Sequence, residues 1–126
     1  MTAQAVPGDR RRLTHRRRFP DPDALRAVRF DTRVRSIEES IRRELALTLR
    51  LPSADRVATG RPLRAQGAGS IAAVRIAGLL ERGLRVRISP VELLRDDSVT
   101  ELAVLLAMRL EGRAEAHLTG PGGARR

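Results

Sequence analysis

The sequence contains no cysteine, no tryptophan and no tyrosine, and its two aromatic residues are Phe19 and Phe30. Without cysteine the chain can form no disulfide, no thiolate metal site and no cysteine nucleophile. Any thiol chemistry must therefore come from an added group. Because both phenylalanines lie within the first 30 residues, a core built from the rest of the chain must be aliphatic.

Long apolar runs are also missing. No stretch approaches the roughly 18 consecutive apolar residues that a spanning helix needs, and the N-terminal region lacks the apolar block of a secretory signal. We therefore expect a soluble, cytoplasmic protein with no membrane partner. With 126 residues the chain has room for one ordinary domain with tails, and we expect a monomer.

Positive charge is abundant and unevenly distributed. The formal net charge is +10, and all 25 basic residues are arginines. Residues 1–35 include the arginine runs 10–12 and 16–18 and show no sustained helical period, so burial cannot offset the entropy of ordering them. We predict a disordered arm over residues 1–35, a folded domain over 36–111 and a flexible tail over 112–126.

The first predicted helix begins at Ser36. Glu39 lies three residues later, which is the capping-box spacing. An apolar stripe with four-residue spacing follows, made of Ile37, Ile41, Leu45 and Leu49. From Pro52 to Gly69 we predict a long loop, anchored in the core by Leu51, Val57 and Leu63.

Three more helices follow the loop. The second runs from Ser70 to Arg82, where Gly83 is expected to supply a left-handed C-terminal cap. Capping-box patterns open a short third helix at Ser89 and a fourth helix at Ser98. These elements predict an all-α fold, a small four-helix bundle with a long first loop and a short third helix.

The second predicted helix has two distinct faces on a helical wheel. Its core side carries Ala73, Ile76, Ala77 and Leu80. Its outer side carries Ile71, Val74, Arg75, Gly78 and Arg82. Exposed apolar residues beside a serine at a helix start favour a docking surface around a modification point, and the helix N-terminus suits a phosphate on that serine.

The folded region resembles the carrier proteins of polyketide and nonribosomal peptide synthases. The resemblance covers residues 36–111 without an insertion and rests on Leu63, Gly67-Ala68-Gly69-Ser70-Ile71, Ala73-Val74-Arg75-Ile76, Leu93-Leu94, Ser98-Val99 and Leu102-Ala103. It implies that Ser70 bears a covalent 4'-phosphopantetheine arm. It also implies that partner enzymes dock on Gly69, Ile71, Val74, Arg75, Gly78 and Arg82.

The function implied by this resemblance is that of a stand-alone carrier, not an enzyme. Acyl or aminoacyl groups would be held as thioesters on the arm at Ser70 for polyketide or nonribosomal peptide-type biosynthesis. The implied partners are a phosphopantetheinyl transferase, an adenylating or acyl-loading enzyme, and downstream synthase enzymes. Gly69 replaces the family's aspartate, and Arg75 and Arg82 replace acidic residues on the outer face, so we expect partners with a neutral or acidic surface.

Three alternatives compete with this interpretation. Ser70 can be a simple helix cap, although no glutamate follows it three residues later, unlike the other predicted helix-opening serines, Ser36, Ser89 and Ser98. The chain can also be a degenerate carrier fold that is never modified, because of Gly69. A third alternative is a small basic nucleic-acid-binding protein acting through residues 10–18, which the lack of an aromatic stacking platform disfavours.

The remaining ionisable residues indicate no reaction centre. His15 and His117 lie one in each tail without neighbouring metal ligands, so we assign no metal site. Asp96 and Asp97 are adjacent carboxylates, and they fit a lead into the cap of the fourth helix better than acid–base catalysis.

Overall fold

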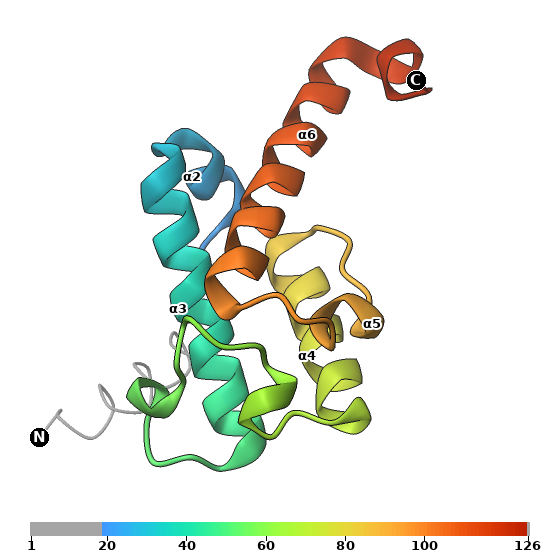
Figure 1. Ribbon diagram of the computed structural model, residues 1–126. Helices are drawn as coiled ribbons and strands as arrows, with labels where there is room; N and C mark the ends of the chain where they lie inside the picture. Colours follow the sequence, from blue (N-terminus) through green and yellow to red (C-terminus); the bar gives the residue numbers. More distant parts are fainter. Residues whose placement is uncertain (1–18, 126) are drawn as a thin grey trace, which may run out of the picture.

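The computed structural model describes residues 19–125, and side chains through residue 112. Its helices, in chain order, are α2 (Pro22–Ala27), α3 (Phe30–Leu49), η1 (Ala54–Arg56), η2 (Arg64–Gln66), α4 (Ser70–Leu84), α5 (Pro90–Leu93) and α6 (Val99–Arg125) (Figure 1). Residues 19–125 contain no β-strand, only an isolated bridge. The predicted all-α class is confirmed, whereas the arginine runs at 10–18 and His15 lie outside the described residues.

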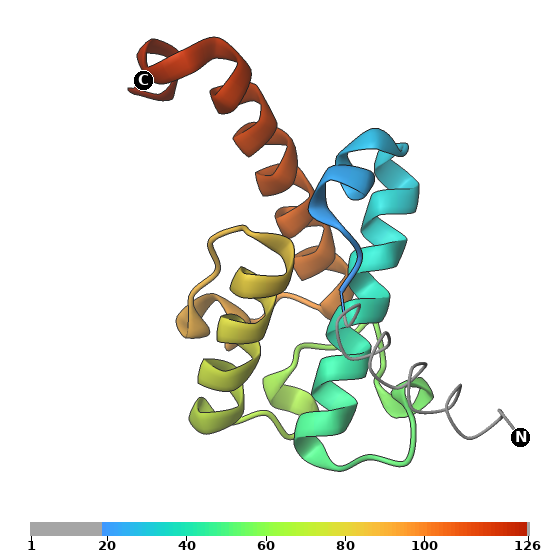
Figure 2. The same cartoon turned by 180° about the vertical axis from the view of Figure 1, so that it is seen from behind.

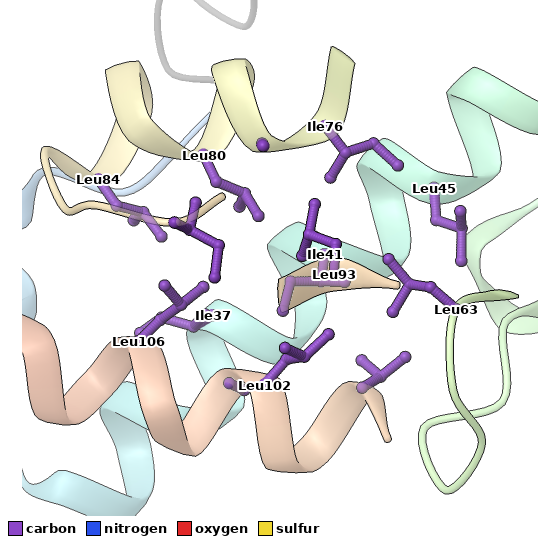
Figure 3. Close-up of a cluster of buried hydrophobic side chains, with 14 of the residues drawn as sticks. Ile37, Ile41, Leu45, Leu63, Ile76, Leu80, Leu84, Leu93, Leu102 and Leu106 are labelled. Atoms are coloured by element: carbon purple, nitrogen blue, oxygen red, sulfur yellow. The ribbon is translucent and has the colours of Figure 1, made fainter. Parts of the chain in front are cut away.

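An aliphatic core lies between the three long helices. α3 packs against both α4 and α6, and the short α5 packs against α4. Figure 3 shows side chains from these helices converging on one cluster. Its fully buried members include Ile37, Ile41 and Leu45 from α3, Ile76 and Leu80 from α4, and Leu102 and Leu106 from α6. The expectation of a core without aromatic residues is confirmed for this cluster.

The N-terminal part of the bundle differs from the prediction. α3 begins at Phe30, so the capping box expected at Ser36 is wrong. Residues 22–27 form α2, and residues 30–35 are the first turns of α3, rather than part of a disordered arm, because Arg33 is buried and docks α2 on α3. Its Nε donates to the Leu25 carbonyl at 2.9 Å. This contact joins residues eight positions apart and leaves no periodic signal in the sequence.

The end of α4 also differs from the prediction. Gly83 is helical, and the residue with left-handed backbone is Arg85, at φ 57°. The helix continues because Leu84 is fully buried in the core. Gly83 has another role, since a Cβ there would overlap the ring of Phe19. The missing side chain lets Phe19 lie directly against α4.

The C-terminal helix is longer than expected. α6 continues to Arg125 instead of ending at residue 111, so the predicted flexible tail over 112–126 is helical through that residue. The residues that follow Gly112, Arg-Ala-Glu-Ala, are helix formers and carry the helix onward. The views in Figures 1 and 2 both show the end of α6 extending beyond the other helices.

Both capping boxes in the second half of the chain are confirmed. Ser89 Oγ accepts from the Glu92 N–H at 3.2 Å, and Glu92 Oε1 accepts from the Ser89 N–H at 2.9 Å. The same reciprocal pair joins Ser98 and Glu101, at 3.1 and 2.8 Å. α5 and α6 therefore begin where the sequence places them.

Candidate functional site

The connection between α3 and α4 is ordered and fixes the start of α4. Val57 and Leu63 are buried, as predicted, and Leu51 packs partly against the core. The Gln66 amide bridges the loop, since Oε1 accepts from the Ala58 N–H at 2.7 Å and Nε2 donates to the Ala58 carbonyl at 2.8 Å. Main-chain hydrogen bonds also join the loop to the first turn of α6. The loop thus holds the N-terminus of α4 in a defined place.

Two glycines flank the last turn before α4. Gly67 has φ 109°, a left-handed conformation that glycine adopts without strain. Ala68 is buried and holds the turn against the core. Gly69 takes the N-cap position with extended backbone, and no atom lies within 4 Å of the place where its Cβ would be. The approach to the helix start is therefore sterically open.

Ser70 is the first residue of α4, and it is exposed. Within the described part of the chain, no hydrogen bond engages its hydroxyl, and no side chain caps the amides of the first turn. That turn also contains no acidic residue. An unbonded hydroxyl thus stands beside free N–H groups at the positive end of the helix dipole.

The other serines from Ser40 to Ser98 are differently placed. Ser40 is fully buried, and its hydroxyl donates to a carbonyl one turn earlier in α3. The hydroxyls of Ser53, Ser89 and Ser98 each accept a backbone N–H at the start of a helix. A simple capping role is therefore the role of these three, not of Ser70, whose own helix has Gly69 as its N-cap.

Apolar side chains lie exposed next to Ser70. Ile71 is 88% exposed and Val74 is 61% exposed. On the opposite side of α4, Ala73 and Ile76 are completely buried, so the two faces derived from the helical wheel are confirmed. Exposure of two β-branched residues costs solvation free energy unless a partner covers them.

The outer face of α4 is basic. Arg75 and Arg82 are exposed, and Arg82 Nη1 lies over Gly78, 3.3 Å from where a Cβ would be. The one carboxylate of α4 belongs to Glu81, which accepts from the Ile88 N–H at 3.1 Å. The helix therefore presents positive charge beside the apolar pair.

An ion pair fixes α5 against α6, next to α4. Arg109 Nη1 donates to Glu92 Oε1 at 3.1 Å. This hydrogen bond, with the one from the Ser89 N–H, lowers the pKa of Glu92 from 4.5 to about 2. The same contact raises the pKa of Arg109. Glu92 thus stays ionised and joins α5 to α6.

No metal-ligand cluster lies beside Ser70 in the described part of the chain. The residues of that part contain no group of three or more histidine, cysteine, aspartate or glutamate side chains placed to hold a metal ion. None of the described helices is both long and apolar enough to cross a membrane. Asp96 forms an ion pair with Arg64, which joins η2 to the segment before α6, and the His117 side chain lies outside the described part.

Sequence reasoning missed the structural basis of this site. Gln66 braces the loop, and a lone glutamine in a loop gives no pattern that predicts this. The positive φ of Gly67, which forms the turn before α4, is not indicated by the sequence pattern. The role of Gln66 depends on a contact with Ala58, eight residues earlier in the chain.

The family comparison agrees with this geometry. The family model described as the phosphopantetheine attachment site matches residues 39–106, more than half of the chain. No curated protein and no solved structure gave a match. Domains of this family carry 4'-phosphopantetheine covalently on a serine, and the exposed hydroxyl and free amides at the start of α4 fit such a group. The chain belongs to the phosphopantetheine attachment family, the family of acyl and peptidyl carrier proteins.

Proposed function

We propose that this protein is a cytoplasmic, non-catalytic carrier that bears its 4'-phosphopantetheine on Ser70. The arm supplies a terminal thiol that holds acyl or aminoacyl groups as thioesters for polyketide or nonribosomal peptide-type biosynthesis. The observation that carries the proposal is the state of Ser70, which is exposed and without a hydrogen-bonded partner among the described residues. The other serines in the matched region cap helices or lie buried.

The geometry around Ser70 suits attachment by a separate transferase. The Ser70 oxygen would attack the pantetheine-side phosphorus of the coenzyme A pyrophosphate, break the bond between its two phosphates and lose its proton to a base of that enzyme, with Mg²⁺ on the phosphates. The adenosine bisphosphate part of coenzyme A would leave. The phosphodiester that remains on Ser70 is negative, and the uncapped first-turn amides of α4 stabilise it by about 0.3–1 kcal/mol.

Partners of this carrier are proposed to approach over the outer face of α4. Ile71 and Val74 supply exposed apolar surface, and Arg75 and Arg82 supply positive charge. The open space around Gly69 lets another backbone come close to Ser70. We infer that the transferase, the loading enzyme and the synthase enzymes present neutral or acidic docking surfaces here.

Mass spectrometry tests the proposal. The full-length chain is coexpressed with a broad-specificity phosphopantetheinyl transferase, and the expected result is a gain of one phosphopantetheine unit. Ser70→Ala should abolish this gain. Ser53→Ala is the matched control, because Ser53 is also exposed but its hydroxyl accepts the Asp55 N–H, and this variant should be modified like the wild type.

Two results would contradict the proposal. Modification that survives in Ser70→Ala would assign the arm to another residue. No mass gain with several transferases, together with an intact fold by circular dichroism, would mean that Gly69 has made the chain an unmodified scaffold.

A further inference from the structure

The exposed face of α4 continues from Ser70 to the far end of the helix. Ile71, Val74, Gly78 and Glu81 follow one another at spacings of three, four and three residues, which places them in one stripe along the helix. Arg85, the first residue after the helix, continues the stripe toward the following loop. From Ile71 to Arg85 the chain advances 14 residue steps, or about 21 Å at 1.5 Å per step. All of its members except the half-buried Gly78 are exposed.

A recess lies at the end of this stripe. It has a volume of about 970 Å³ and is lined by Glu81 and Arg85 from the stripe, by the following loop, and by α6. From α6 it receives residues 105, 108, 109 and 112, whose spacing forms one face of that helix. The recess therefore lies between the end of α4 and the middle of α6, and the stripe ends at it.

The recess combines an apolar floor with a basic rim. Val86 is buried and Leu105 half-buried at its floor, and Met108 is 55% exposed at its edge. The loop that carries Val86 is held by the hydrogen bond from the Ile88 N–H to Glu81. An apolar side chain inserted from outside would therefore meet a preformed surface.

The charges along this route are mostly positive. Arg75 and Arg82 flank the stripe, and Arg87 is exposed at the recess. Arg109 also lines the recess, but its charge is paired with Glu92. Since Glu81 is the single acidic residue that lines the recess, the net positive lining favours an acidic partner over a neutral one.

We propose that the stripe and the recess together form one docking groove for an acidic amphipathic helix of a partner enzyme. Such a helix would cover Ile71 and Val74 near Ser70 and place an apolar side chain in the recess, with carboxylates facing the arginines. Gly78 lies midway, and the Arg82 guanidinium that lies over it can face a carboxylate of the partner helix. The second anchor is thus about 20 Å from Ser70 along α4, clear of the reacting end of the arm.

The shape of the recess favours a helix over a small ligand. Small-molecule sites usually enclose 70–90% or more of their ligand, whereas three residues on the edge of this one, Arg85, Arg87 and Met108, are exposed. Its opening joins the end of a long exposed stripe. An elongated partner would contact both the stripe and the recess, whereas a compact anion would contact only the recess.

This inference rests on the proposed carrier function for the identity of the partner as an enzyme that acts at Ser70. Its test uses the full-length Ser70→Ala chain, so that binding does not depend on the arm. The probe is a fluorescein-labelled synthetic helix of about 14 residues, long enough for the 21 Å stripe, with a leucine stripe and flanking glutamates. A second peptide carries lysine in place of each glutamate.

We expect the acidic peptide to bind, as measured by fluorescence anisotropy, and the lysine peptide to bind at least about tenfold more weakly. Met108→Glu and Arg87→Glu should each weaken binding of the acidic peptide by about tenfold or more. The matched controls are Leu47→Glu and Arg56→Glu, which change an equally exposed apolar residue of α3 and an exposed arginine of η1. These controls should change binding by less than about twofold.

Three outcomes would overturn the groove: equal binding of both peptides, equal weakening by the controls, or no binding up to about 1 mM peptide. Binding of decanoate in the recess without binding of the peptide would make it a small-anion site and also refute the proposal. A chain that gains phosphopantetheine at Ser70 but fails these tests keeps its carrier function and loses only the groove. A chain that binds the peptide but is never modified loses the carrier function instead.

Discussion

Replacing Arg33 by alanine tests whether the N-terminal helix is an integral part of this carrier domain. Arg33 is only 5% exposed. Besides the bond to Leu25, its Nη2 donates to the carbonyls of Arg26 and Val28 at 3.2 and 3.3 Å. A longer bond of 3.5 Å reaches the Ala107 carbonyl of α6. One side chain therefore joins α2, α3 and α6.

The expected loss of stability follows from these contacts. A hydrogen bond to a charged group contributes about 1.5–3 kcal/mol, and burial of the guanidinium offsets part of that gain. Counting the two shortest bonds fully and allowing for this offset, Arg33→Ala should lower the free energy of unfolding by about 3 kcal/mol. For a domain of this size the loss corresponds to a fall in Tm of about 15 °C.

Urea unfolding followed by circular dichroism measures this change. Arg35→Ala is the matched control, because Arg35 lies in the same helix but is exposed, and it should change stability by no more than about 0.5 kcal/mol. Trypsin should also cut faster after Arg26 and Arg29 in Arg33→Ala, since α2 would leave the bundle. Equal free energies of unfolding for the two variants would show that the Arg33 hydrogen bonds to α2 do not stabilise the domain, and would refute the reasoning.

Three further changes test other contacts. Because the pKa of Glu92 is lowered from 4.5 to about 2, the ionised carboxylate contributes fully to the free energy of unfolding above pH 4.5, and this contribution is lost as the pH falls toward 2. Glu92→Gln should therefore lower the free energy of unfolding by about 2 kcal/mol at neutral pH. The urea midpoint of this variant should also fall less steeply between pH 4.5 and pH 2 than that of the wild type. Gly69→Asp places the family's acid where no atom obstructs it. This variant should raise the free energy of unfolding by a few tenths of a kcal/mol, because the aspartate caps α4. It should also be modified faster than the wild type in a time course of mass gain. Gly83→Ala should lower the free energy of unfolding by about 1–3 kcal/mol, because the added methyl group overlaps the Phe19 ring. In a chain that also carries Phe19→Ala, alanine and glycine at position 83 should give nearly the same stability. Additive effects of the two substitutions would contradict the contact.

Local signals explain what the sequence predicts correctly. The capping boxes at Ser89 and Ser98 involve residues three positions apart, so they are visible in the sequence. The exposure of Ile71 and Val74 follows from helical period alone, because every turn of α4 must turn the same side to the core. The fold class and the neighbourhood of Ser70 were therefore predictable.

Tertiary contacts explain what the sequence does not predict. The start of α3 depends on Arg33 meeting carbonyls of another helix, and the end of α4 depends on the burial of Leu84. Gly83 resembles a helix terminator in sequence because its contact with Phe19 spans 64 positions of the chain. The recess requires α6 to lie beside the end of α4, which no local pattern reveals.

The aliphatic core has a practical consequence for spectroscopy. With no tryptophan or tyrosine anywhere in the chain, the protein has no background emission when excited at the long-wavelength edge of indole absorption. Val74→Trp would introduce a lone fluorophore at a 61% exposed position, outside the packed interior. Every change in its emission would then report directly on what covers α4, in real time and without a label.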